Sequence, residues 1–244
     1  MDYFYCPPDN ISKDTLLIGG DEFVHLTHVM RKNVGDIFFV VDGHGKAYEV
    51  RLEEIKKKTA RCSILQQFSN YHEPARDVTL GVGVLKNHSK FDFLVEKVTE
   101  LGVREIIPIH TERTIPSHAK VDRWQKLALA AMKQSGRAYL PQVKALMTLD
   151  DFLVHTKGSN LKLIAHEKID TTTPLHNIPS TIAKSITILI GPEGGFTDLE
   201  VERAVAAGYT IVSLGERRLR TETAAIVLTA LSILLSTEKY QGDH

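Results

Sequence analysis

Cysteine is scarce in this chain, which holds only Cys6 and Cys62 among its 244 residues. Two cysteines are too few for a disulfide framework, and their spacing does not match that of a zinc site. The chain is therefore not a disulfide-stapled domain, and we expect both thiols to be free and packed in the interior.

An excess charge of either sign and a long apolar run are also absent. The 30 basic residues balance 30 acidic ones, so no overall field attracts polyanions, and nucleic-acid binding must be local. No apolar run approaches the ~20 residues that span a bilayer, which excludes a membrane-spanning helix. The segment MDYFYCPPDN lacks the basic stretch and apolar stretch of a secretory signal. We therefore expect a cytoplasmic protein.

The segments that are present indicate two domains. Residues 1–72 read as β-rich, with a hairpin in DIFFVVDGHGKAYEVRL, a further strand in TARCSILQQF and a short helix in DEFVHLTHVMR that Asp21 caps. This pattern is typical of a small β-barrel. The polar segment SNYHEPARD, which contains Pro74, then marks the boundary to a second domain over residues 73–244.

The second domain alternates short apolar strands with amphipathic helices. Strands are expected in VTLGVGVL, REIIPIH, LKLIAH, ITILIG and TIVSLG. Helices are expected to end near Gly102 and Gly136, and a capping box from Thr197 to Glu200 begins another. Such alternation predicts a parallel sheet covered by helices, an α/β fold. The last helix, TETAAIVLTALSILLST, is apolar on nearly every face, which indicates burial against the sheet or a second subunit.

Glycine-rich loops follow two of these strands. GPEGG occupies Gly191–Gly195, and LGERRLRTETA begins at Leu214. Ligands of parallel sheets bind beyond the carboxyl ends of the strands, where glycine lets the backbone approach closely. A tight turn explains one such loop equally well, but two in succession favour a ligand site. A dinucleotide fingerprint fits poorly, because Lys86 stands where the third glycine after Gly81-Val82-Gly83 belongs.

These loops resemble the cofactor region of the knotted SPOUT methyltransferases. EKVTELGVREIIPIHTERT and RWQKLALAAMKQSGRAYLP resemble the bacterial ribosomal RNA small subunit methyltransferase E family in particular, and HLTHVMRKNVGDIFFVVDGHGKAY is similar to its PUA-like RNA-binding module. The resemblance covers nearly the whole chain. It implies a C-terminal α/β domain with a deep trefoil knot, an N-terminal PUA-like β-barrel and a homodimer.

The resemblance also implies a cofactor and a substrate. The cofactor is S-adenosyl-L-methionine, and the substrate is ring nitrogen N3 of a uridine in 16S ribosomal RNA, in an assembled small subunit, with no DNA partner. The residues expected to bind the cofactor are His166, Gly191, Pro192, Glu193, Gly194, Gly195, Leu214, Gly215, Arg218, Leu219, Thr223 and Ala224.

Methylation of N3 requires removal of its proton, so a base or a cation is needed beside the uracil edge. Arg220 is expected to stabilise charge on a uracil oxygen and Glu222 to accept the proton, with Gln134 and Arg137 as further catalytic candidates. A carboxylate favoured by the helix macrodipole explains Glu222 equally well. The residues expected to contact RNA are Arg31, Lys32, Lys86, Arg113 and Arg137.

Three alternatives concern a metal site, another RNA substrate and a protein without catalytic activity. His25 and His28 have a spacing compatible with metal ligands, but no carboxylate or cysteine partner is evident, so we expect no metal. A SPOUT enzyme acting on another RNA, such as transfer RNA ribose, differs only in its substrate. A non-catalytic RNA-binding assembly protein has no need of two glycine loops or of Arg220.

Overall fold

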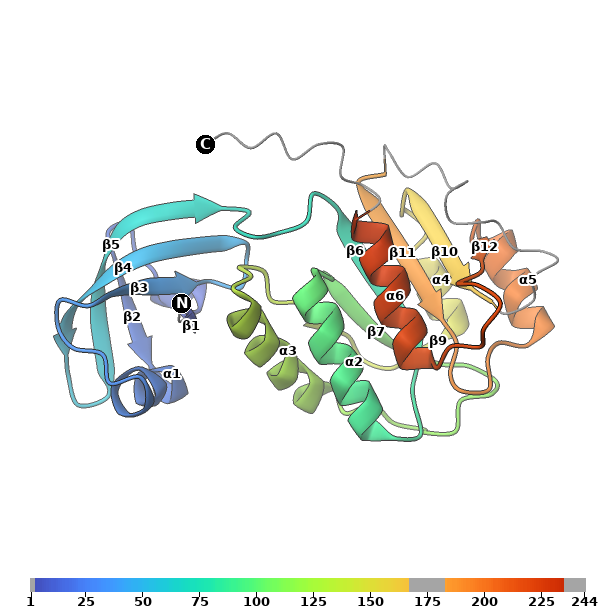
Figure 1. Ribbon diagram of the computed structural model, residues 1–244, viewed down its shortest axis with the longest axis horizontal. Helices are drawn as coiled ribbons and strands as arrows, with labels where there is room; N and C mark the ends of the chain where they lie inside the picture. Colours follow the sequence, from blue (N-terminus) through green and yellow to red (C-terminus); the bar gives the residue numbers. More distant parts are fainter. Residues whose placement is uncertain (1–2, 167–182, 235–244) are drawn as a thin grey trace. The chain divides into compact units, whose positions relative to one another are not determined.

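The computed structural model describes residues 3–166 and 183–234 (Figure 1). The chain divides into two compact units of two segments each: Met1–Glu73 with Leu129–Leu140, and Pro74–Ala128 with Pro141–His244. The sequence-based division assigned 129–140 to the second domain, whereas these residues belong to the first unit. The reason is hydrophobic, because Met132 and Ala138 are buried in one cluster with Phe39.

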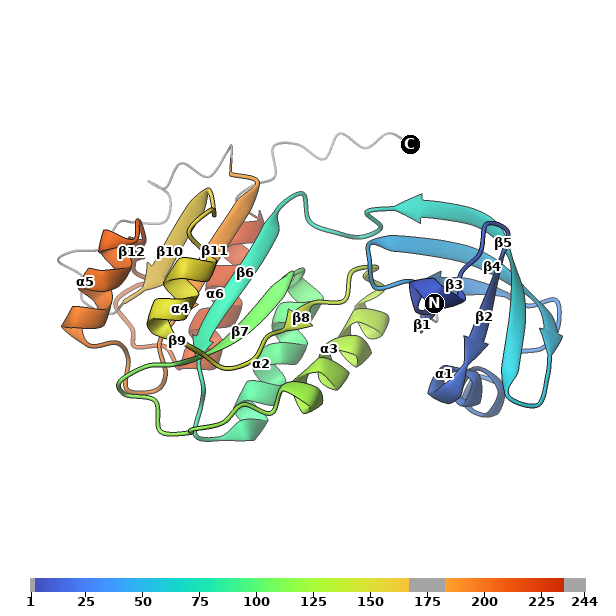
Figure 2. The ribbon, with the colours of Figure 1, turned by 180° about the vertical axis from the view of Figure 1, so that it is seen from behind.

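A five-stranded mixed sheet forms the first unit. Its order is β1-β3-β4-β5-β2, with β1 parallel to β3 and the other neighbours antiparallel. Strands β4 and β5 are long and bend along their length (Figure 2). The strands are β1 (Tyr3–Tyr5), β2 (Thr15–Gly19), β3 (Ile37–Val41), β4 (Lys46–Ile55) and β5 (Thr59–Ser69).

The predicted hairpin is confirmed, because β3 and β4 pair antiparallel. In the turn between them, the carboxylate of Asp42 accepts hydrogen bonds from the amides of His44 and Lys46. Both cysteines are buried and free, as expected. A short 3-10 helix, η1 (Pro8–Asn10), precedes β2.

The helix predicted to begin after Asp21 begins two residues earlier, at Gly20, and changes its winding. Helix α1 (Gly20–Val24) passes into a π-helical turn, η2 (His25–Val29), where the Met30 amide bonds the His25 carbonyl at 2.9 Å. Asp21 lies in the first turn, and the N-cap is Gly19 without a side-chain hydrogen bond. The expected cap was wrong, because Gly20 has a φ of 59° at the strand-to-helix turn, a conformation that favours glycine.

A seven-stranded sheet, parallel at every pairing of the described residues, forms the second unit. Its order is β12-β10-β11-β6-β7-β8, and β9 also pairs with β7. The expected α/β sheet is confirmed. The strands are β6 (Asp77–Gly83), β7 (Glu105–His110), β8 (Gln142–Val143), β9 (Met147–Thr148), β10 (Leu161–Ala165), β11 (Ser185–Ile190) and β12 (Thr210–Val212).

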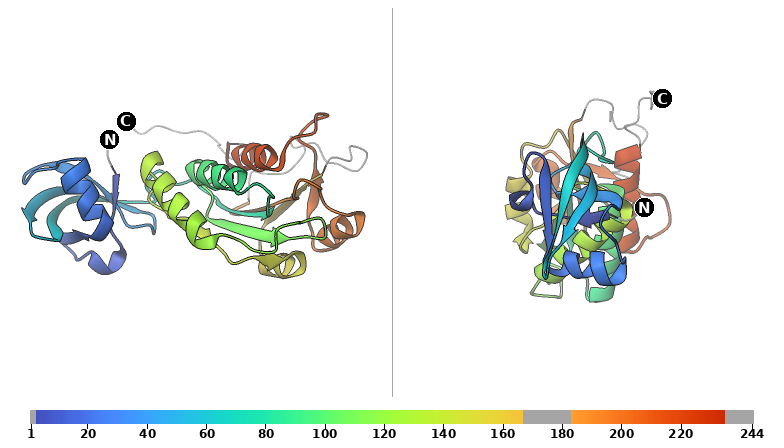
Figure 3. Two further views of the ribbon diagram at one scale, coloured as in Figure 1. Left: turned by 90° about the horizontal axis from the view of Figure 1, so that it is seen from below. Right: turned by 90° about the vertical axis from the view of Figure 1, so that its left-hand side faces the viewer.

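Helices cover both faces of this sheet (Figure 3). Helix α6 packs on β6, β11 and α2, and α4 packs on β7 and β9 against the opposite face. The described helices are α2 (His88–Leu101), α3 (Val121–Ser135, with 129–135 in the first unit), α4 (Leu149–His155), α5 (Asp198–Ala206) and α6 (Thr221–Leu234). In the ranges that the structure describes, no helix is both long and apolar enough to cross a membrane.

Two helix ends in the second unit follow the sequence signals. Gly102 ends α2 in the left-handed region with a φ of 115°, as its position predicted. Thr197 and Glu200 form the predicted capping box at the start of α5, so the GPEGG loop passes into α5 through a fixed turn. The short helix α4 was not expected, because it has only seven residues and little periodicity.

Candidate functional site

A cavity of about 610 Å³ lies beyond the carboxyl ends of β10, β11 and β12. Strand β10 lies between the other two in the sheet, and ligands of parallel α/β folds bind beyond this end of the strands. The lining residues are Lys90, Arg113, Ala165, His166, Ile190, Gly191, Pro192, Glu193, Gly195, Phe196, Asp198, Ser213, Leu214, Gly215, Glu216, Arg217, Arg218, Leu219, Arg220, Thr221, Glu222 and Ala224.

The GPEGG loop forms one wall of the cavity and packs closely on the end of β6. A Cβ atom placed on Gly83 would lie 2.4 Å from the backbone nitrogen of Pro192, so only glycine allows this approach. The Lys86 amide donates to the carboxylate of Glu193 at 3.1 Å. These contacts fix the loop after β11 against the loop after β6.

The loop after β7 supports the same wall from another side. The Arg113 guanidinium donates through Nη1 to the carbonyls of Gly194, at 2.9 Å, and Phe196, at 3.2 Å. The buried Glu200 carboxylate accepts from the amides of Glu112 and Thr197, both at 2.8 Å. Arg113 was expected to contact RNA, and in the structure it also holds the glycine loop in place.

The second glycine loop, from Ser213 to Arg220, forms the opposite wall. Gly215 has a φ of 104°, a conformation that favours glycine, and its amide donates to the Ser213 hydroxyl at 3.2 Å. Arg218 donates to the Glu193 carbonyl at 3.4 Å and so joins the two glycine loops. The loop side chains Glu216, Arg217 and Arg220 are exposed, which leaves their charged groups accessible to a ligand.

An ion pair lies where α6 begins. The Lys90 ammonium, from the first turn of α2, lies 3.4 Å from Oε1 of Glu222 in the first turn of α6. Glu222 is buried, with 8% of its surface exposed, and its Oε2 has no hydrogen-bond partner among the described residues. A buried carboxylate oxygen without a donor is costly unless a ligand completes it.

Most of the expected site residues meet at this cavity. Of the residues expected to bind the cofactor, all but Gly194 and Thr223 line it, and Arg220, Glu222 and Arg113 line it as well. Sequence reasoning did not single out Lys90, Ser213 or Asp198 for this site. For Lys90 the signal was present in KNHSK, the basic segment that opens the first helix of this unit.

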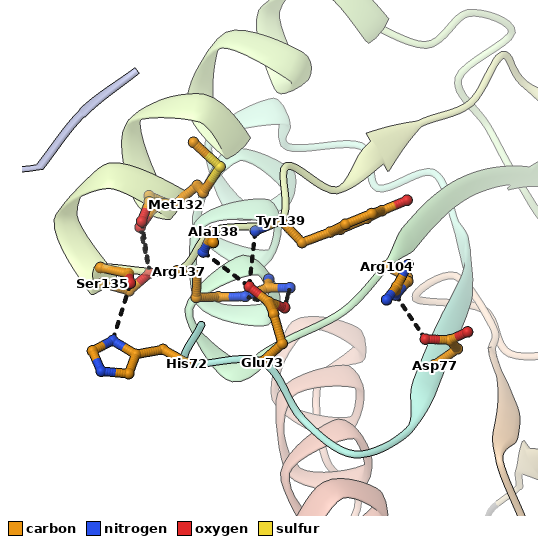
Figure 4. Close-up of polar contacts among 11 residues, drawn as sticks. His72, Glu73, Asp77, Arg104, Met132, Ser135, Arg137, Ala138 and Tyr139 are labelled. Atoms are coloured by element: carbon orange, nitrogen blue, oxygen red, sulfur yellow. Dashed lines mark hydrogen bonds and ion pairs between the residues drawn. The ribbon is translucent and has the colours of Figure 1, made fainter. Parts of the chain in front are cut away.

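Other expected residues lie elsewhere. Arg137 is 2% exposed in the first unit, where its guanidinium donates to the Glu73 carboxylate at 2.6 Å (Figure 4). The amides of Ala138 and Tyr139 donate to the other oxygen of Glu73. A phosphate contact by Arg137 conflicts with this buried pair, because the guanidinium is neither exposed nor uncompensated.

The remaining candidates are separate from the cavity lining. Gln134 is exposed at the end of α3, and Arg31 is exposed after the π-helical turn with a φ of 52°. Lys32 is half-buried, and Lys86 is exposed beside the Glu193 contact. Within the described ranges, no group of three or more His, Cys, Asp or Glu side chains could hold a metal ion.

Both units of the chain are similar to domains of known RNA methyltransferases. A family model described as RNA methyltransferase domain matches residues 72–233, and one described as RNA methyltransferase PUA domain matches residues 18–65. The ribosomal RNA small subunit methyltransferase E of Bacillus subtilis is 31% identical, covering 94% of this chain and 93% of the relative.

A Synechocystis protein of the same name is 33% identical over 94% of this chain and 77% of its own. The crystal structure of the ribosomal RNA small subunit methyltransferase E from Neisseria gonorrhoeae bound to S-adenosyl methionine is 33% identical, with a TM-score of 0.87 and coverage of 97% of this chain and 98% of that chain. With this architecture, this pair of glycine loops and these relatives, the chain belongs to the ribosomal RNA small subunit methyltransferase E family.

Proposed function

We propose that this protein transfers a methyl group from S-adenosyl-L-methionine to ring nitrogen N3 of a uridine in 16S ribosomal RNA of the small subunit. Family membership supports an RNA methyltransferase. The observation that carries the proposal is the cavity between the two glycine loops, with Arg220 and Glu222 in its lining.

The cavity suits a nucleoside cofactor in size and in chemistry. Its volume of about 610 Å³ lies within the usual range for small-molecule sites, about 300–1,000 Å³. Gly195 and Gly215, with φ of 68° and 104°, present backbone without side chains on opposite walls. When bound, S-adenosyl-L-methionine supplies a methyl group that its sulfonium has already activated.

In this proposal the chain's own residues prepare the uracil. Glu222 takes the N3 proton, because N3 becomes a good nucleophile only as that proton leaves. The exposed Arg220 stabilises the negative charge that develops on a uracil oxygen. Fixing the glycine loops through Arg113 and Glu193 keeps the reacting atoms aligned, which supplies much of the remaining rate.

Phosphate contacts are assigned to the exposed basic side chains. Arg31 lies within the segment that matches the PUA family model, and Arg113 keeps exposed donors besides the one that holds the loop. Lys32 and Lys86 also remain candidates for phosphate contact, whereas Arg137 is no longer proposed for it because it is buried against Glu73. Such contacts give affinity and position rather than choice of sequence.

Three further expectations belong to this proposal: a homodimer, a deep trefoil knot in the second unit and a location in the cytoplasm. Helix α6 supports the first, because Ile226, Val227, Leu231 and Ile233 are only partly buried along an apolar helix. An apolar helix side left partly exposed suits an interface with a second copy.

The test is methyl transfer from labelled S-adenosyl-L-methionine to RNA from a strain that lacks the activity. Assembled small subunits and naked 16S RNA are compared, and the modified nucleoside is identified by mass spectrometry. We expect 3-methyluridine, with subunits as the better substrate. A different methylated nucleoside would overturn the site of methylation, and absence of cofactor binding would favour a non-catalytic RNA-binding protein.

A further inference from the structure

Lys90 lines the cavity, and the proposed chemistry gives it no role. Its ammonium lies 3.4 Å from Oε1 of Glu222, with 33% of its side chain exposed. The two residues come from different helices, α2 and α6, which pack against each other. The ion pair therefore joins the first turn of α2 to the first turn of α6 at the edge of the cavity.

Helix stability does not explain this position. Lys90 lies in the first turn of α2, where a cation opposes the helix macrodipole, and no acidic residue in that turn compensates it. The helix is capped instead by Asn87, whose side chain accepts from the Ser89 amide. Among the described residues, Glu222 is the ion-pair partner of the Lys90 ammonium.

The two oxygens of Glu222 differ in their surroundings. Oε1 pairs with Lys90, whereas Oε2 is buried without a hydrogen-bond donor among the described residues. Holding one oxygen restricts rotation of the carboxylate and so defines which oxygen is left for a donor. The N3–H group of uracil is such a donor, and the carbonyl oxygens that flank it accept hydrogen bonds.

We propose that Lys90 is a positioning residue that orients Glu222 so that Oε2 takes the N3 proton of the target uridine. This inference rests on the proposed function. The N3–H bond breaks and its proton passes to Oε2. The N3 electron pair forms a bond to the methyl carbon, the bond between that carbon and sulfur breaks, and its electron pair stays on sulfur. Lys90 itself exchanges no proton in this step.

The experiment compares Lys90→Met, Lys90→Arg and the control Lys97→Met in the full-length protein with unmodified small subunits. Lys97 lies on the same helix, forms ion pairs with Glu96 and Glu100, and does not line the cavity. We expect Lys90→Met to lower kcat about 100-fold, the low end for proton transfer by a positioned group. KM for subunits and the calorimetric Kd for cofactor should stay within about twofold. Lys90→Arg should restore most of the rate, and Lys97→Met should match the wild type.

A second arm separates positioning from RNA binding. In a Glu222→Gln background, Lys90→Met should cause no further loss of kcat, because its effect passes through that carboxylate. Without cofactor or RNA, the Tm shifts of the two single variants and the double variant should be non-additive. An unchanged kcat in Lys90→Met, an independent loss in the Glu222→Gln background, or a raised KM alone would overturn the inference. Identifying the nucleoside that the wild-type protein methylates tests the proposed function separately. A nucleoside other than 3-methyluridine would overturn that function, whereas the non-additive Tm shifts of the Lys90 and Glu222 variants would be unaffected.

Discussion

A single methyl group at Gly83 would be enough to disturb the cavity. The added Cβ would meet the nitrogen, Cδ and Cα of Pro192 at 2.4, 2.5 and 2.9 Å, and backbone cannot yield as a flexible side chain can. We expect Gly83→Ala to lower the free energy of unfolding by about 1–3 kcal/mol and to weaken cofactor binding, measured by denaturation and calorimetry. Gly158→Ala is the control, because no atom lies within 4 Å of its added Cβ. Equal cofactor affinity in both variants would show that the wall tolerates the displacement.

Arg137 and Glu73 form the most deeply buried ion pair among those described, with side chains 3% and 5% exposed. Arg137→Met leaves the Glu73 carboxylate buried with only two backbone amides as donors. We expect a loss of about 3–5 kcal/mol in unfolding free energy, measured by urea denaturation. Arg203→Met, which breaks an exposed pair with Asp150, should cost about 1 kcal/mol at most. A similar small loss in both variants would remove the structural role assigned to Arg137.

At the scale of elements, the start of α5 also shapes the cavity. Thr197→Ala removes the capping-box hydroxyl, for which we expect a stability loss of about 1 kcal/mol. Thr148→Ala removes the matching cap of α4, whose residues do not line the cavity, and should cost a similar amount. Calorimetric binding of cofactor should weaken only in Thr197→Ala. If cofactor affinity fell in both variants, the cause would be the lost stability rather than a change in the GPEGG loop.

Glu105, on β7, contacts α4 and the segment between β8 and β9, and it makes their packing sensitive to pH. Burial alone would raise the pKa of Glu105, but hydrogen bonds from His155 and Lys144 outweigh it and hold the pKa below its ordinary value of 4.5. Because the folded-state pKa is the lower one, this stabilisation is present above about pH 4.5 and is lost as pH falls through the folded-state pKa.

Unfolding free energy followed from pH 6 to pH 3 should therefore fall more steeply in the wild type than in Glu105→Gln. The control Glu202→Gln, at an exposed position on α5, should keep the wild-type slope. Parallel curves for the wild type and Glu105→Gln would contradict the assignment.

At the scale of the whole molecule, we expect light scattering to give about twice the chain mass of 27.3 kDa. Leu234→Glu places a charge at a position that is 64% exposed at the end of α6, and it should weaken the dimer at least tenfold. Val154→Glu changes a residue that is 74% exposed on α4 and should leave the dimer intact. A monomeric wild type, or equal weakening by both variants, would contradict an interface on α6.

Periodicity predicted the elements well where they are long. The alternation of apolar strands and amphipathic helices led to the parallel sheet, and Gly102 and the Thr197 capping box marked helix ends as local hydrogen bonds require. The π-helical turn after Val24 and the short helix α4 were missed, because neither leaves a periodic pattern of sufficient length.

The sequence by itself determined the α/β class and the two glycine loops, since these depend on spacing along the chain, and its motifs carry the resemblance to the family. Tertiary structure alone decided which side chains meet. It paired Lys90 with Glu222 across 132 residues of sequence, buried Arg137 against Glu73, and turned one donor of Arg113 toward the GPEGG loop. The physical reason is that such contacts depend on the order of strands and the packing of helices, which bring together residues whose separation in sequence has no period to reveal them.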